Sequence, residues 1–241
     1  MPYRKTSKKS YKRLSKTVPK STKRYVKSTI HRMSETKFLT VEHPDIPVTL
    51  ASTTLLITSE LAPGDSSTQR VGDKVEMLSV LYRYTVRASK TLVFVNGDEF
   101  NKVRIIFYRW RDMLRSDQVP IISDVLHDLG VTTTRINLMY NQDNLDQGRL
   151  HIVSDRTHVL GNYVYFDGGT NVVYTSSDGI KNVSGRFFGK RLGKKYLKYG
   201  VTNDANVTES TDQLYCLVVS DSSTLPHPTI DLSMRFFYKD I

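Results

Sequence analysis

Lysine and arginine side chains crowd the start of this chain, where they could neutralise phosphate groups. The first 37 residues hold 13 of them and one acid, Glu35, which gives a net charge of +12. The remaining 204 residues hold 22 basic and 23 acidic side chains, so their net charge is −1. A row of cations binds nucleic acid tightly at low salt and almost without regard to base sequence. The arm therefore predicts a nucleic-acid contact.

Twelve cations of the arm are the expected contacts: Arg4, Lys5, Lys8, Lys9, Lys12, Arg13, Lys16, Lys20, Lys23, Arg24, Lys27 and Arg32. Residues 1–37 have too few large apolar side chains to bury a core, so we expect them to be disordered alone. The lysines recur every three or four residues, and a transient helix would gather them on one face, although Pro19 interrupts it.

Two further features of the arm bear on its partners. Tyr3, Tyr11 and Tyr25 fit stacking on unpaired bases, which favours single strands over duplex. The stretch KKSYKR at residues 8–13 fits a nuclear localisation signal, so a nuclear import receptor is an expected partner. The cations extend over the whole arm, beyond what an import signal needs.

A second basic cluster interleaves cations with aromatic rings in GRFFGKRLGKKYLKYG. Its cations are Arg186, Lys190, Arg191, Lys194, Lys195 and Lys198. In a shell this cluster would suit a second nucleic-acid contact on the inner wall or an outer site for a glycan receptor on the host cell. The simpler alternative is a solvated strand face balanced by neighbouring acids.

The sequence contains none of the catalytic motifs that we considered. GRFFGKR lacks the Ser or Thr of a phosphate-binding loop, the six histidines never show HxxxH or HExxH spacing, and there is no GxSxG elbow. The single cysteine, Cys216, lies in the apolar run LYCLVV and is expected to be a small buried residue. Asp143 and Asp146 fit a calcium site between subunits, but turn-forming acids are the more frequent case. We expect no catalytic residues, cofactor or metal.

A membrane is the other common polyanion, but the arm lacks the apolar stripe of a membrane-surface helix. No run of 18 apolar residues exists and no cleavable leader follows the charged N-terminus, so we expect neither membrane insertion nor secretion.

Residues 38–241 are predicted to form one all-β domain, because period-two apolar patterns alternate with turn-forming clusters. The predicted strands cover residues 48–60, 74–88, 102–112, 149–159, 184–198, 213–221 and 229–239, with an eighth short or irregular. A two-turn helix is expected within 119–130, and a small hairpin within 160–183. Long strands joined by long loops favour an eight-stranded, double-sheet antiparallel jelly roll, and Trp110 is expected to be a core or interface anchor.

Several stretches resemble one family of viral proteins. They are GDSSTQRVGDKVEMLSVLYRYTV, NKVRIIFYRWRD, PIISDVL and HPTIDLSMRFFYKD, in this order after a basic arm. Together they resemble the capsid proteins of small circular single-stranded DNA viruses of the circovirus-like kind. The arm is richer in Lys than the arms of that family, which leaves the choice between DNA and RNA open.

This resemblance implies a virion shell of sixty copies, formed in the host nucleus, with the arm turned inward onto a single-stranded genome. DNA is the favoured cargo. The alternatives are the capsid protein of a small RNA or satellite virus and a non-viral nucleic-acid-binding β-domain. Host, receptor and triangulation number are left open.

Overall fold

The structure is a computed structural model, and it divides into two units, residues 1–35 and residues 36–241. It describes residues 19–33, 35–56, 61, 64, 66–72, 74–88, 100–111, 120–127, 135–161, 179–189, 191–192, 196–199, 212–223, 225 and 227–240. The described part of the first unit contains helix α1 (Lys20–Met33), and the strands belong to the second unit.

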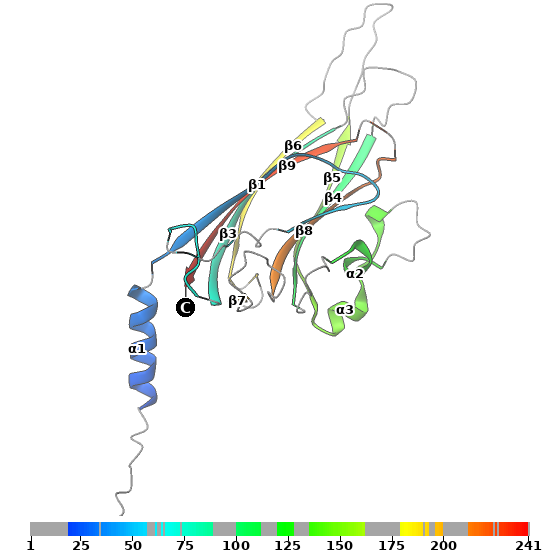
Figure 1. Cartoon of the computed structure of the whole chain (residues 1–241). Helices are drawn as coiled ribbons and strands as arrows, with labels where there is room; N and C mark the ends of the chain where they lie inside the picture. The colour runs from blue at the N-terminus through cyan, green and yellow to red at the C-terminus, as the bar shows by residue number, and fades with distance from the viewer. Residues whose placement is uncertain are drawn as a thin grey trace, which may run out of the picture. The chain divides into compact units, whose positions relative to one another are not determined.

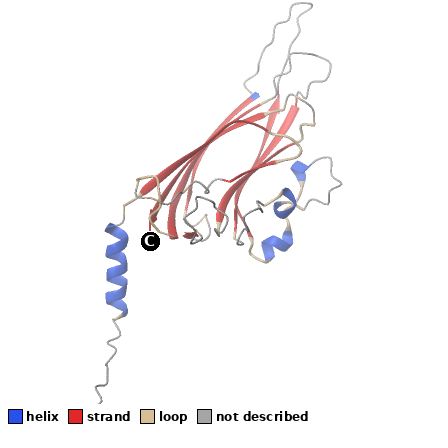
Figure 2. Ribbon diagram, viewed as in Figure 1, coloured by secondary structure: helices blue, strands red, loops and turns tan. Residues whose placement is uncertain are grey.

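Five strands build the first sheet, which we call the β3 sheet (Figures 1 and 2). Its order is β1-β9-β3-β6, and the short strand β7 also pairs with β3. The strands are β1 (Lys37–Pro47), β3 (Lys74–Arg87), β6 (Ile180–Phe188), β7 (Tyr196–Lys198) and β9 (Thr229–Asp240). Every pairing is antiparallel, and the last strand, β9, lies between β1 and β3.

Four strands build the second sheet, which we call the β4 sheet. Its order is β2-β8-β4-β5, again with antiparallel pairs only. The strands are β2 (Thr53–Leu56), β4 (Phe100–Trp110), β5 (Leu150–Gly161) and β8 (Gln213–Ser220). Strand β8 is buried along its whole length, because it has a strand on either side and packed residues on both faces.

The chain passes repeatedly from one sheet to the other. Strands β1, β3, β6 and β9 belong to the β3 sheet, whereas β2, β4, β5 and β8 belong to the β4 sheet. Two antiparallel four-stranded sheets connected in this way form a jelly roll, with β7 as an addition. The predicted all-β jelly roll is therefore confirmed.

The main core lies between the two sheets, where alternate residues of the strands meet. The ring centroids of Tyr82 and Phe107 are 5.3 Å apart, and those of Tyr82 and Phe187 are 4.5 Å apart. Gly185 faces Tyr82 across the β3–β6 pair, and a Cβ atom there would lie 2.4 Å from the Tyr82 hydroxyl oxygen. Cys216 is fully buried in this core, as predicted, and burial raises the pKa of its thiol.

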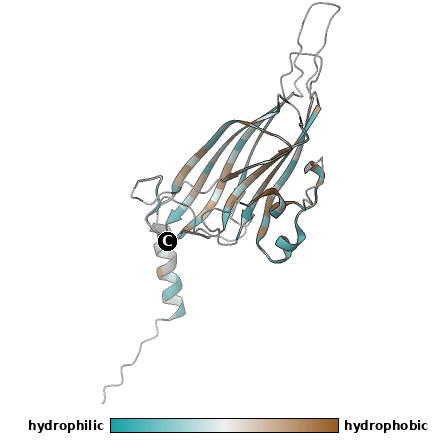
Figure 3. Cartoon of the chain, turned by 45° about the vertical axis from the view of Figure 1, so that its right-hand side comes forward, coloured by the Kyte–Doolittle hydropathy of each residue, from teal (hydrophilic) through white to brown (hydrophobic). Residues whose placement is uncertain are grey.

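A second apolar cluster covers the other face of the β4 sheet. The connection between β4 and β5 supplies α2 (Ile122–Val125), the 3-10 helix η1 (Arg135–Asn137) and α3 (Gln142–Asp146), and Figure 1 shows α2 and α3 outside that sheet. Buried Val125 and Leu126 pack there with Trp110, which is 7% exposed, as expected for a core anchor. Figure 3 shows that most of the hydrophobic colouring lies on the strands.

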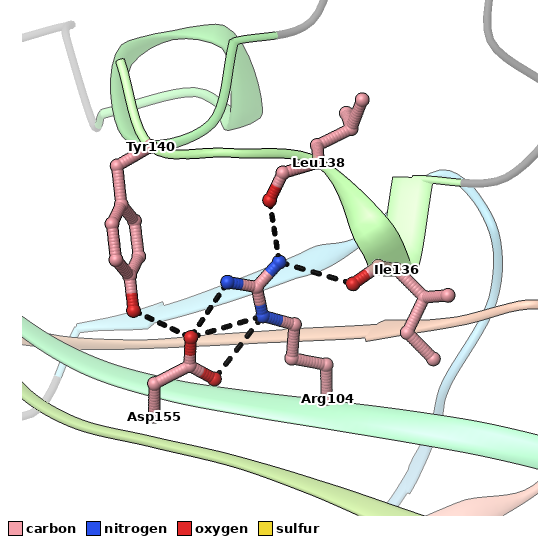
Figure 4. A network of polar contacts seen from close by, with 5 residues as sticks. All are labelled: Arg104, Ile136, Leu138, Tyr140 and Asp155. Atoms are coloured by element: carbon pink, nitrogen blue, oxygen red, sulfur yellow. Dashed lines mark hydrogen bonds and ion pairs between the residues drawn. The ribbon is translucent and has the colours of Figure 1, made fainter. Parts of the chain in front are cut away.

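A polar network fastens this connection to the sheet (Figure 4). The Arg104 Nε atom lies 3.1 Å from both carboxylate oxygens of Asp155, and its Nη2 atom lies 2.6 Å from one of them. Its Nη1 atom donates hydrogen bonds to the carbonyl oxygens of Ile136 and Leu138, at 3.0 and 2.7 Å. The Tyr140 hydroxyl donates to the same carboxylate. One ion pair thus holds residues 136–140 in place.

Five predicted strands are confirmed with their ends shifted by at most two residues, namely β3, β4, β5, β8 and β9. The predicted strand at 48–60 contains β2. Most of the predicted hairpin, residues 162–178, lies outside the described residues.

Three predictions about the second unit are wrong. We placed no strand before residue 48 and expected the eighth strand to be short or irregular, but β1 has 11 residues and forms an edge of the β3 sheet. The strand expected at 184–198 is two strands, β6 and β7, because the chain turns after Phe188. The two-turn helix expected within 119–130 is the single turn α2, since Leu126 is already extended.

Candidate nucleic-acid interface

Helix α1 arranges part of the basic arm in a row. Lys20, Lys23 and Arg24 are exposed, and their spacing places them on one face of the helix. Lys27 holds the next position of this row, and Arg32 lies near the end of the helix. We predicted residues 1–37 to be disordered alone, with a transient helix as an option, and over Lys20–Met33 the structure has a helix.

The helix begins directly after Pro19, which we expected to interrupt it. The Pro19 carbonyl oxygen accepts a hydrogen bond from the Lys23 backbone N–H at 3.0 Å. Proline costs little here, because backbone N–H groups at the start of a helix have no carbonyl partner in any case. The first turn contains no acidic residue, so the positive end of the helix dipole and the lysine row repel each other. An external polyanion would remove that repulsion.

Seven of the predicted contacts lie outside the described residues: Arg4, Lys5, Lys8, Lys9, Lys12, Arg13 and Lys16. Their role stays a prediction, as do those of Tyr3, Tyr11 and the import signal. Tyr25 is 73% exposed on α1, so its ring is accessible to a partner.

The second basic cluster does not lie along one strand. Arg186 is exposed on β6, whereas Arg191 lies in the turn that follows it and Lys198 pairs with Lys74 in the β7–β3 ladder. The other three cations, Lys190, Lys194 and Lys195, lie outside the described residues. The turn replaces the single strand that we predicted, so only Arg186 has a described side chain on the sheet itself.

Arg109 holds that turn from the β4 sheet. Its side chain is 1% exposed, and its Nε atom donates to the Asp212 carbonyl oxygen at 2.9 Å. Its Nη1 atom donates to the Leu192 carbonyl oxygen, and the His151 ring nitrogen lies 3.1 Å from the Arg191 carbonyl oxygen. Burial lowers the pKa of Arg109 to about 10, which leaves it charged at neutral pH. Residues 191 and 192 are thus held by side chains of the β4 sheet, whereas Arg186 lies on β6 of the β3 sheet.

Arg186 has neighbours on the sheet that sequence analysis missed. Its Nη2 atom donates to the Ser79 hydroxyl at 2.7 Å, and its guanidinium lies 5.0 Å from the Phe188 ring centroid and 5.4 Å from that of Phe237. Arg235 occupies the same row on β9. The sequence signal for Arg235 and Phe237 was available, because both alternate with the buried residues of the last strand.

The described residues give little support for a metal site or a membrane-spanning helix. There, no three His, Cys, Asp or Glu side chains gather closely enough to hold a metal ion. Asp143 and Asp146 lie on α3, where Asp146 accepts a hydrogen bond from the Gln142 side chain at 2.8 Å. None of the described helices is long and apolar enough to cross a membrane.

Comparisons with known proteins identify a coat-protein family. A family model described as satellite tobacco necrosis virus coat protein matches residues 6–241. No curated protein matches the chain. Sixteen chains of solved structures match. One, from Desmodium yellow mottle tymovirus, is 9% identical, covers 86% of this chain and 86% of that chain, and has a TM-score of 0.35. A TM-score this low supports no conclusion about this chain.

The family match overturns the resemblance to circovirus-like capsid proteins. The matching model is that of a satellite virus coat protein, so the preference for a DNA genome also loses its basis. The stretches that suggested the resemblance lie largely on β3, β4 and β9. Apolar residues must alternate in this way in any strand whose sheet packs against a second sheet. The pattern therefore indicates the jelly roll but does not identify the family.

Proposed function

Because the chain belongs to the satellite tobacco necrosis virus coat protein family, we propose that it packages single-stranded RNA inside a small icosahedral shell. As a coat protein it is a component of the virion, with a structural role. Assembly and genome binding are divided between the two units: the sandwich forms the wall, and the arm neutralises the genome. RNA replaces the DNA that the earlier resemblance implied.

The separation of charge along the chain carries this proposal. The arm has a net charge of +12 and the sandwich segment −1, so many sandwiches can pack side by side without strong repulsion. Closed icosahedral symmetry with one copy per position uses sixty copies, and sixty arms would supply about 720 positive charges for the genome. The exposed cations of α1 fit a contact with phosphates that ignores base sequence.

The test purifies the full chain after expression in bacteria and examines it by electron microscopy and nuclease digestion. We expect closed particles whose contents, once released, are digested by ribonuclease and resist deoxyribonuclease. A matched variant keeps all residues of the arm but replaces its twelve predicted contact cations with Gln. It should form empty or few particles.

Two results would contradict the proposal. Single subunits at every ionic strength would favour a nucleic-acid-binding β-domain that does not assemble. An unchanged RNA content in particles of the Gln variant would show that the arm does not carry the packaging. Nuclear import and glycan binding stay sequence predictions, and the family match adds no support to either.

A further inference from the structure

One face of the β3 sheet points away from the β4 sheet and carries exposed arginines beside phenylalanine rings. The strand register sets two adjacent rows across β1, β9, β3 and β6. One row is Thr40, Arg235, Leu81 and Arg186, and the other is Phe38, Phe237, Ser79 and Phe188. A third row continues the pattern with Glu42, Ser233, Arg83 and Ser184.

The guanidinium groups of this face lie against the rings. Arg186 contacts Phe188 and Phe237, and the guanidinium of Arg235 is 5.3 Å from the Phe38 ring centroid. The rings remain open to solvent, since Phe188 is 59% exposed and Phe38 is 42% exposed. Flat cations and flat rings side by side offer planar surfaces on which bases can stack.

The positive charge of this face is largely unbalanced. Arg83, Arg186 and Arg235 are all exposed, and none has a carboxylate of a described residue within 4.0 Å. The acid of the next row, Asp231, is paired with Arg87. Within the three rows, three arginines therefore face one acid, Glu42.

A groove of about 280 Å³ lies within the arginine rows. Thr40, Leu81, Arg83 and Arg235 line it, and Glu42 lies on the β1 side. An anion in this groove would have Arg83 and Arg235 beside it, and Glu42 would repel it from the β1 side. The groove thus favours an anion positioned toward β3 and β9.

We propose that this face is a second contact for the packaged single strand, at which phosphates meet Arg83, Arg186 and Arg235 and unpaired bases stack on Phe38 and Phe188. The inference rests on the proposed function, because it names a further surface for the same genome. It replaces the predicted cluster at 186–198 by one whose members come from four strands. A second copy of this face fits poorly, because a symmetric contact would place unpaired arginines opposite one another.

The first test measures binding of a short labelled oligouridine to the full chain over a range of salt concentrations. The double variant Arg186→Gln and Arg235→Gln should lower the slope of log affinity against log salt by about 1.4, at about 0.7 for each lost phosphate contact with a single strand. The matched control, Lys102→Gln with Arg149→Gln, removes the same charge from exposed positions on β4 and before β5. It should leave the slope unchanged.

The second test crosslinks RNA containing bromouridine inside purified particles and identifies the peptides by mass spectrometry. Crosslinks are expected at Phe38 and Phe188. The variant Phe188→Leu keeps an apolar side chain, so it should assemble but lose the crosslink on β6.

Crosslinks confined to residues 1–35, or an unchanged salt slope in the double variant, would overturn the inference and leave the proposed function intact. Failed assembly with an unchanged salt slope would also overturn it, since the face would then be a contact between subunits. Wild-type particles without RNA would instead contradict the proposed function.

Discussion

Arg104 on β4 and Asp155 on β5 form an ion pair with 2.6 Å between Nη2 and a carboxylate oxygen, and the same guanidinium holds two carbonyl groups of the connection above it. The pair therefore joins the β4 sheet to the segment that covers it. Arg104 is 9% exposed, so this carboxylate, and not solvent, balances most of its positive charge.

Replacing Asp155 with Asn should lower the free energy of unfolding by about 2 kcal/mol, because the buried guanidinium loses its counterion. Urea unfolding of dissociated subunits measures this, since assembly itself would add stability. The control Asp146→Asn removes an exposed carboxylate from α3 and should change the free energy by less than about 0.5 kcal/mol. Equal midpoints for the two variants would show that the ion pair contributes nothing.

Gly185→Ala should destabilise the sandwich, because the new methyl group would lie 2.4 to 2.8 Å from the Tyr82 ring and hydroxyl. That ring cannot move freely, since it stacks on Phe187 and contacts Phe107. We expect a loss of about 1–3 kcal/mol in the free energy of unfolding, as for an overpacked core. In the control, Gly189→Ala, the nearest atoms lie 3.8 and 3.9 Å away, so its thermal unfolding should be close to wild type.

Local patterns predicted the strands that lie inside the sheets. Strand β9 and much of β3 alternate buried and more exposed residues, whereas β8 and most of β4 are continuous runs of buried residues rich in Val, Ile, Leu and aromatic side chains. Burial on one or both faces keeps such runs extended. The first strand, β1, was missed because its sequence, KFLTVEHPDIP, contains two prolines and an irregular register between His43 and Ile46. An edge strand tolerates both, since one side of its backbone needs no partner.

The candidate site was less predictable, because its members are distant in sequence. Arg186 and Arg235 are 49 positions apart and become neighbours only through their common partner Leu81 on β3. A linear search for cations found the run at 186–198, which a turn then divides. Charge composition predicted that nucleic acid would be bound, whereas strand register determines which cations share a face.

The stability of the sandwich should fall steeply above about pH 10. Burial raises the pKa of Tyr84, Tyr140 and Tyr238 to about 12 each, and raises those of other buried tyrosines further. Between pH 10 and 12 the unfolded chain therefore loses protons that the folded chain keeps, so stability is full below pH 10 and is lost as pH rises. Tyrosinate absorbance and circular dichroism should change together. A gradual rise in tyrosinate absorbance while the β-sheet signal persists would contradict this.

Repulsion between its own cations should lower the helicity of α1, because Lys20 and Arg24 are four residues apart and the first turn has no acidic residue. In a peptide of residues 18–36, Lys20→Glu would place an anion at the positive end of the dipole and pair it with Arg24, which together favour the helix by about 0.5–1 kcal/mol. Circular dichroism should show more helix in this variant than in wild type when no polyanion is present. Lys27→Glu makes the same change of charge nearer the other end, where the dipole gives no such benefit. A second measurement adds oligouridine to each peptide. If helicity then rises most in the wild-type peptide, the arm folds against the phosphates that it neutralises. Equal helicity in all three peptides before the addition would show that charge repulsion does not limit the helix.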